Sequence, residues 1–117
     1  MLTIASRIDV MNRLGRAMAD GTRSRILLSL LERPGYPGEL ACDLGLSRSN
    51  VSNHLACLRG CGLVAAVPEG RSTRYEIADP HLTKALVALV DVVLAVDDGA
   101  DCIDGTCDLP LCCGTGA

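Results

Sequence analysis

The sequence contains no phenylalanine and no tryptophan, and only two of its 117 residues are tyrosines. Even so, 49% of the residues are hydrophobic. Any hydrophobic core must therefore be aliphatic, built from leucine, valine, isoleucine, alanine and methionine. The length is that of one domain, and a small aliphatic core often shares its burial with a partner subunit.

Long hydrophobic segments are also missing. No run approaches the roughly 20 apolar residues that a membrane-spanning helix needs. The beginning of the chain, MLTIASRIDVMNRL, has an arginine at position 7 and no apolar stretch typical of a secretory signal. We therefore expect a cytoplasmic protein that does not contact membranes. In that compartment, cysteines more often bind metals or react as thiols than form disulfides.

Enzyme signatures are absent as well. The sequence has no phosphate-binding glycine loop, no evident pairing of a nucleophile with a base and no evident pair of catalytic acids. We expect a protein that is not an enzyme.

Lysine is nearly absent, with one residue against ten arginines. Residues 1–79 hold the ten arginines against eight acidic residues, a balance of +2, whereas residues 80–117 have a balance of −5. Arginine suits bidentate contacts with phosphates and base edges. An ordinary solvated surface is the alternative for most of these side chains.

Apolar periodicity and turn residues predict the order helix, helix, helix-turn-helix, hairpin, helix. The expected elements are helices over residues 3–19, 22–32 and 37–45, a helix from the N-cap Ser47 to about Leu58 or Gly60, strands over residues 63–67 and 73–78, and a helix over residues 81–96. This order is that of a winged helix-turn-helix, a mainly α fold with a β-hairpin wing.

The first and last predicted helices carry more apolar surface than a domain of this size needs. We expect them to form a homodimer interface; the alternative is that helix 81–96 fills its own core. We divide the chain into a DNA-binding and dimerisation domain over residues 1–96 and a cysteine-rich tail over residues 97–117.

The segment LSRSNVSNHLACL has the pattern of a DNA-reading helix. Val51, Leu55 and Leu58 recur at helical spacing and should form its buried stripe. The opposite side presents short hydroxyl and amide groups, which can contact phosphates and base edges in the major groove. An ordinary exposed helix is the alternative, but such helices usually carry glutamate and lysine, and this one has neither. The predicted DNA contacts on this helix are Ser47, Arg48, Ser49, Asn50, Ser52, Asn53 and His54.

Two arginines of the predicted hairpin extend this surface. Arg71 lies at the hairpin loop and Arg74 on the second strand. A basic wing beside a reading helix would contact the DNA backbone or minor groove. His54 resembles a metal ligand in isolation, but its place in the polar run favours a DNA or structural role.

Cys57 and Cys61 stand four residues apart on the predicted reading helix, so their Cβ atoms should lie roughly 6 Å apart on one face. Two thiolates at that spacing can share one metal ion; the alternative is that Cys57 is a small core residue. A third donor can come from the tail, DCIDGTCDLPLCC, which holds Cys102, Cys107, Cys112 and Cys113. Sites made only of sulfur select soft ions such as Cd(II), Pb(II), Hg(II), As(III) or Cu(I), and Zn(II) if a fourth ligand joins. Cys42 stands alone on the short helix, where we expect it in the core.

The run SRSNVSNHLACLRGCGLV…EGRSTRYEIAD, together with the order of elements, resembles the ArsR/SmtB family of metal-responsive repressors over about residues 10–96. It is most similar to the CmtR branch, the cadmium- and lead-sensing repressors of actinobacteria. The resemblance implies a metal site of Cys57 and Cys61 on the reading helix with Cys102 in the tail, the tail cysteine coming from the other subunit of a dimer.

Two other site types of this family are incomplete. Asp79 and His81 match the start of a zinc site on the last helix, but Val92 and Ala95 stand where its second pair belongs. A two-cysteine motif on the short helix retains only Cys42. Three tail cysteines, Cys107, Cys112 and Cys113, exceed the three-cysteine pattern; they could form a second site, pass metal to the first, or take arsenite.

The resulting hypothesis is a homodimeric repressor that binds an inverted repeat in operator DNA and is released when Cd(II) or Pb(II) binds the thiolates. As(III), Zn(II) and Hg(II) are further candidate inducers. One rival is an arsenite- or thiol-redox-sensing repressor of the same fold. Another is a metal-buffering or thiol-transfer protein in which the tail does the chemistry and DNA plays no part.

Overall fold

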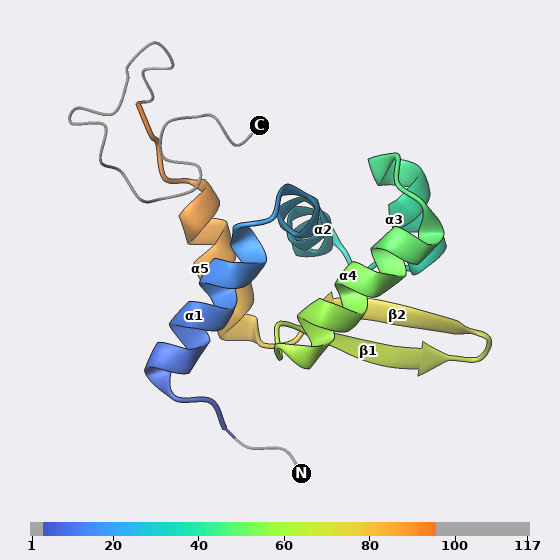
Figure 1. Ribbon diagram of the computed structural model, residues 1–117, viewed down its shortest axis with the longest axis horizontal. Helices are drawn as coiled ribbons and strands as arrows, with labels where there is room; N and C mark the ends of the chain where they lie inside the picture. The colour runs from blue at the N-terminus through green and yellow to red at the C-terminus, as the bar shows by residue number, and fades with distance from the viewer. Residues whose placement is uncertain (1–3, 96–117) are drawn as a thin grey trace.

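The computed structural model describes residues 4–95 (Figure 1). Five helices and one hairpin follow each other along the chain. They are α1 (Arg7–Met18), α2 (Gly21–Glu32), α3 (Pro37–Leu44), α4 (Arg48–Gly60), β1 (Val64–Glu69), β2 (Ser72–Ile77) and α5 (Pro80–Val90). This confirms the predicted winged helix-turn-helix. The predicted boundary between residues 96 and 97 lies outside the described residues and stays a prediction.

The core is aliphatic, as the missing aromatics require. Its most deeply buried large side chains are Ile26 of α2 and the stripe of α4, where Val51 and Leu55 are 0% exposed and Leu58 is 1% exposed. The stripe predicted from helical spacing is confirmed. Because Val51, Leu55 and Leu58 fall on one side of α4, the opposite side of the helix is left at the surface.

Two local hydrogen-bonded features define the turn of the helix-turn-helix, one at the end of α3 and one at the start of α4. Gly45 ends α3 in the left-handed conformation (φ 69°), and Leu46 N–H donates to the Ala41 carbonyl at 2.9 Å. Such a bond satisfies a carbonyl that the helix end leaves without a partner. Ser47 then caps α4, its Oγ accepting from Asn50 N–H at 3.1 Å. The predicted cap at Ser47 is confirmed, and it fixes where α4 begins.

The wing is an antiparallel pair in which Val64 faces Ile77 and Glu69 faces Ser72. Gly70, at φ 61°, forms the tight turn between the strands. The hairpin is tied to the helical body where Gly35 and Tyr75 exchange two backbone hydrogen bonds of 2.9 and 2.8 Å. Figure 1 shows the hairpin reaching away from α1 and α5 and running beside α4.

Helices α1 and α5 leave much apolar surface uncovered. Exposed on or beside them are Ile4, Ile8, Val10, Met11, Met18, Val87, Leu89, Val90, Val92, Val93 and Leu94. Within the described chain, no helix is both long and apolar enough to cross a membrane.

The ends of these two helices differ from the predicted bounds. α1 begins at Arg7 rather than residue 3, because Ser6 caps it by accepting from Asp9 N–H at 3.1 Å. The prediction that the last helix runs to residue 96 is wrong over residues 91–95, since α5 stops at Val90. Val92 and Val93 are 56% and 90% exposed. Adjacent β-branched residues with nothing to pack against extend a helix poorly.

Candidate DNA-reading helix and thiol site

The first half of α4 presents the predicted polar face. Ser47, Arg48, Ser49, Asn50, Ser52 and Asn53 are exposed, and His54 is half-buried. The helix contains no acidic residue. Hydroxyl and amide side chains without neighbouring carboxylates on the same helix suit contact with a polyanion. The structure therefore makes these groups available, while their contact with DNA stays a prediction.

A groove connects this face with the wing. It lies between the start of α3, the exposed side of α4 and the tip of the hairpin. Arg48, Ser52 and Arg71, all predicted DNA contacts, line it together. Arg48 also lies over the first turn of α3, where a Cβ on Gly38 would stand 3.6 Å from its guanidinium carbon. The groove thus gathers two arginines from separate elements on one surface.

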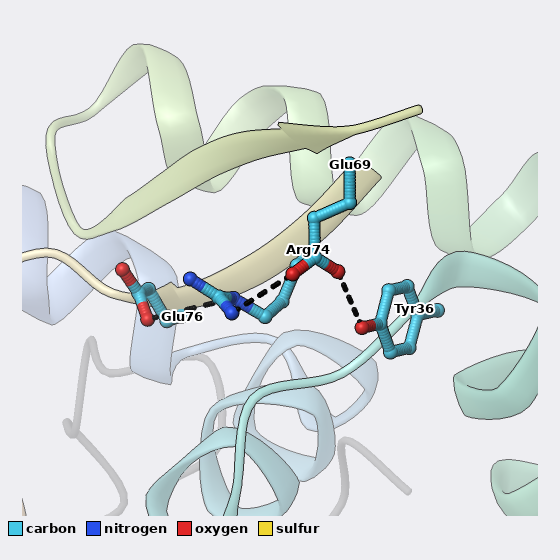
Figure 2. A network of polar contacts seen from close by, with 4 residues as sticks. All are labelled: Tyr36, Glu69, Arg74 and Glu76. Carbon is cyan, nitrogen blue, oxygen red and sulfur yellow. Dashed lines mark hydrogen bonds and ion pairs between the residues drawn. The ribbon is translucent and has the colours of Figure 1, made fainter. Parts of the chain in front are cut away.

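Arg71 and Arg74 have different surroundings. Arg71 is exposed in the turn of the hairpin. Arg74 is held in the network of Figure 2, where its Nη1 donates to Glu69 Oε2 at 3.0 Å and its Nε lies 3.9 Å from Glu76 Oε2. Arg74 Nε is buried without a hydrogen-bond partner. A phosphate would have to compete with two carboxylates for this guanidinium, which leaves Arg71 as the better-placed contact of the two.

The same network joins the wing to the helix-turn-helix. Tyr36, the residue before α3, donates its hydroxyl to Glu69 Oε1 at 2.5 Å. This hydrogen bond is the main reason why the pKa of Tyr36 is raised above its ordinary value. Glu69 therefore bridges Tyr36 and Arg74, as Figure 2 shows, and helps to set the position of the hairpin relative to α3.

The two thiols of α4 lie one helical turn apart. Cys61 caps the end of the helix, and its N–H donates to the Cys57 carbonyl at 3.0 Å. Cys57 is exposed, whereas Cys61 is half-buried and packs against the core. The alternative reading of Cys57 as a core residue is therefore wrong: position 57 falls beside the stripe of Leu55 and Leu58, not within it.

Cys42 corrects another expectation. The structure places it at the surface rather than in the core. Its neighbours Leu40 and Ala41 are the buried residues of α3. Since successive helical residues are turned by about 100°, the next side chain faces away from the core that they fill.

The described residues fit part of a soft-metal site. Two thiols on one helical turn offer two sulfur donors, which is the ligand chemistry that soft ions prefer. Between residues 4 and 95 no group of three or more potential ligands comes together, so a site for one ion needs a donor from elsewhere. The predicted donors Cys102, Cys107, Cys112 and Cys113 lie outside the described residues.

Asp79 and His81 make a local pair at the start of α5. Asp79 Oδ1 accepts from His81 N–H at 2.7 Å and lies 3.1 Å from His81 Nδ1. The backbone bond is the largest cause of the lowered pKa of Asp79. Asp79 therefore acts as the N-cap of the helix, while Val92 and Ala95 supply no ligand atoms.

Comparison with known proteins identifies the family. The model described as "Bacterial regulatory protein, arsR family" matches residues 20–66, from the start of α2 into β1. The transcriptional regulator CmtR of Mycobacterium tuberculosis is 61% identical over 103 residues, which are 88% of this chain and 87% of that protein. This chain belongs to the arsR family. It is a transcriptional regulator with a DNA-binding fold, and not an enzyme.

Two solved structures and one further relative are similar to this chain. The NMR structure of the cadmium metal-sensor CmtR from M. tuberculosis superposes with a TM-score of 0.62 and 64% identity, covering 79% of this chain and 96% of that one. A homodimeric winged helix-turn-helix DNA-binding domain from Mycobacterium bovis gives a TM-score of 0.65 at 31% identity, covering 78% and 90%. A probable mercury resistance operon repressor of Streptomyces lividans is 36% identical over 96 residues, 80% of this chain and 75% of that protein.

Sequence reasoning missed the residues that surround the thiols. Arg23 Nη1 lies 4.0 Å from the Cys57 sulfur, although the two residues are 34 positions apart. Arg13 lines the same cleft as Cys61. Its pKa is raised above the ordinary arginine value, first by its hydrogen bond to Asp9 and to a smaller extent by Cys61. No local sequence pattern predicts these contacts, because they depend on how α1 and α2 pack against the end of α4.

Proposed function

We propose that this regulator represses transcription as a homodimer and leaves its operator when Cd(II) or Pb(II) binds the thiolates of Cys57, Cys61 and Cys102. One observation carries the proposal: an exposed thiol, with a second one turn later, lies on the helix whose first half presents polar groups to solvent. The cadmium-sensing relative supports cadmium as the inducer.

The DNA contact is assigned to the exposed side of α4. Asn50 and Asn53 can pair with adenine edges, and Arg48 can contact a base edge or a phosphate. Arg71 at the wing tip is assigned to the backbone or the minor groove. A dimer would set two such helices about one DNA turn apart, which calls for an operator with an inverted repeat.

The dimer interface is assigned to α1 and α5. Ile8 and Met11 of α1 are 75% and 70% exposed, and Leu89 and Val90 of α5 are 47% and 53% exposed. An uncovered apolar surface of this kind marks an interaction site. The homodimeric relative from M. bovis supports a second copy of this chain as the partner.

When bound, the ion would be coordinated by several thiolates at once. Each thiol gives up its proton to solvent when its sulfur binds, and a site of three thiolates on a divalent ion has a net charge of −1. Cys57 and Cys61 would hold the ion at the end of α4, and Cys102, from the partner subunit, would complete the site. Tying the tail to α4 then opposes DNA binding, with a coupling of about 1–3 kcal/mol.

The test is a titration of CdCl2 into a complex of the protein with a fluorescent duplex from the region upstream of its own gene. We expect the operator affinity to fall about 5- to 150-fold. Cys102→Ser should still bind the duplex but respond weakly, whereas Cys42→Ser, an exposed thiol on α3, should respond fully. A wild-type affinity that cadmium leaves unchanged would refute metal-controlled release.

The same experiment separates the rivals. Peroxide in place of CdCl2 should leave DNA binding intact; if peroxide alone released the duplex, thiol oxidation would be the signal. Binding of Cd(II) without any binding of DNA by the metal-free protein would point to a metal buffer. Parallel titrations with Pb(II), Zn(II), Hg(II) and As(III) rank the inducers, and Cys107→Ser and a Cys112→Ser, Cys113→Ser double variant test whether the additional tail thiols alter that ranking.

A further inference from the structure

Arg23 occupies the junction between α1, α2 and the thiols. Its Nη1 lies within hydrogen-bonding distance of the Cys57 sulfur, at 4.0 Å. Its Nη2 donates to the Arg16 carbonyl at 2.9 Å, and its Nε donates to the Ala17 carbonyl at 3.4 Å. The backbone N–H of Arg23 donates to Asp20 Oδ2 at 2.9 Å. A single side chain therefore connects the candidate ligand Cys57 to the end of another helix.

The carbonyls that Arg23 reaches belong to the last turn of α1. Carbonyls at a helix end have no partner within the helix, and a cation at that end is favoured by the helix dipole. The guanidinium thus caps α1 from outside. Arg23 therefore connects Cys57 to a helix that carries part of the uncovered apolar surface assigned to the dimer interface.

We propose that Arg23 is a positioning residue of the thiol site, through which ion binding at Cys57 acts on the C-terminal end of α1. The inference rests on the proposed function. A thiolate bound to an ion carries negative charge that the neutral thiol lacks, and a guanidinium beside the sulfur stabilises that charge. When the Cys57 sulfur binds an ion, its contact with Arg23 strengthens or shifts. The same guanidinium donates to the carbonyls of Arg16 and Ala17, so these hydrogen bonds change as well.

Arg13 supports the inference from the other thiol. It belongs to α1, forms an ion pair with Asp9 at 3.0 Å and lines one cleft with Cys61. Each thiol of α4 therefore has an arginine nearby that belongs to α1 or bonds to it. The Arg23–Cys57 contact and the cleft that Arg13 shares with Cys61 both connect α1 to the thiol end of α4.

The test compares Arg23→Gln and Arg23→Lys with Arg25→Gln. Arg25 is a matched control because it lies on the same helix and donates to the Leu44 carbonyl at 2.7 Å instead. We expect Arg23→Gln to bind Cd(II) about 10-fold more weakly in competition with a chelator, the usual range for a residue that supports metal ligands being 10- to 100-fold. Arg23→Lys keeps the charge and should recover most of that affinity.

A second readout follows the connection to α1. In both Arg23 variants, the factor by which CdCl2 weakens operator binding should fall about threefold or more, because neither side chain has the planar fork of donors with which Arg23 reaches the sulfur and two carbonyls. Hydrogen exchange of the metal-free protein should be faster at the end of α1 in Arg23→Gln than in Arg25→Gln. A role confined to stability would lower the melting temperature and leave the coupling factor unchanged.

The outcomes separate this inference from the proposed function. If cadmium releases wild-type protein from DNA and both Arg23 variants show the wild-type coupling factor, Arg23 has no positioning role and the proposed function stands. If Arg23→Gln does not fold, Arg23→Lys alone decides. If wild-type protein ignores cadmium, or Cys57→Ser responds like wild type, the proposed function fails and the role of Arg23 fails with it.

Discussion

The two halves of α4 carry different chemistry on one continuous helix. From Ser47 to Asn53 the exposed side chains are hydroxyls, amides and one arginine, and the helix brings no acid to that surface. From Cys57 to Cys61 the surface carries two thiols with arginines of α1 and α2 nearby. Both halves are fixed by the same buried stripe. The two ends are therefore anchored by the same core residues. In the proposed function, this shared support links metal binding at one end to DNA binding at the other.

The largest effect, on the free energy of unfolding, should come from shortening a side chain of the buried stripe that anchors both halves of α4. Leu55 is fully buried between the two halves, and Leu55→Ala should lower the free energy of unfolding by about 2–5 kcal/mol. DNA binding and metal response should both suffer. Urea unfolding followed by circular dichroism measures the loss. A change below about 0.5 kcal/mol would mean that Leu55 does not anchor the helix.

The next test separates the halves. Asn53→Ala should cost about 1–3 kcal/mol of DNA binding through a lost base contact, with little effect on Cd(II) affinity. Cys57→Ser should do the reverse: it should abolish the cadmium response while the protein still binds the duplex. Fluorescence anisotropy and chelator competition on both variants give the comparison. Equal losses in both assays for either variant would contradict the division of α4.

A smaller effect is expected at the start of the reading half. Ser47 caps α4 through its hydroxyl, so Ser47→Ala should destabilise the protein by about 1 kcal/mol. Ser47→Asp keeps a cap and serves as the control for stability, although its charge opposes DNA. Thermal unfolding of the wild type and the two variants measures these stabilities. The expectation fails if the alanine variant has the same melting temperature as the wild type.

The smallest expected effect is a difference between the two wing arginines in the salt dependence of DNA affinity. Arg71→Gln should reduce the slope of log affinity against log salt by about 1, as for one lost phosphate contact. Arg74→Gln should reduce it less, because Arg74 is already paired with Glu69. Equal slopes for the two variants would show that the pairing gives way when DNA binds.

Local chemistry explains what the sequence could predict. The stripe of Val51, Leu55 and Leu58, the Ser47 cap and the exposed polar face all depend on residues within one helix, where spacing determines direction. The exposure of Cys42 was missed because an isolated thiol gives no periodic signal. The end of α5 was missed because apolar residues continue past Val90 while the described chain offers them nothing to pack against.

Contacts between distant segments were out of reach of the sequence. The pairing of Arg74 with Glu69 depends on the register of the hairpin, and that of Arg23 with Cys57 depends on the packing of α2 beside α4. Helical spacing and the resemblance to metal-responsive repressors both indicated the thiols, but neither indicated the arginines around them. The assignment of Cys102 as the third ligand lies outside residues 4–95 and stays a prediction.

The central claim is that metal binding at one half of α4 opposes DNA binding at the other half. It is tested most directly by measuring the affinity for Cd(II) twice, on the free protein and on the protein bound to operator. Linkage requires DNA to weaken cadmium binding by the same factor by which cadmium weakens DNA binding. The account predicts equal factors in the range of about 5- to 150-fold. A cadmium affinity that is identical on and off DNA would contradict it.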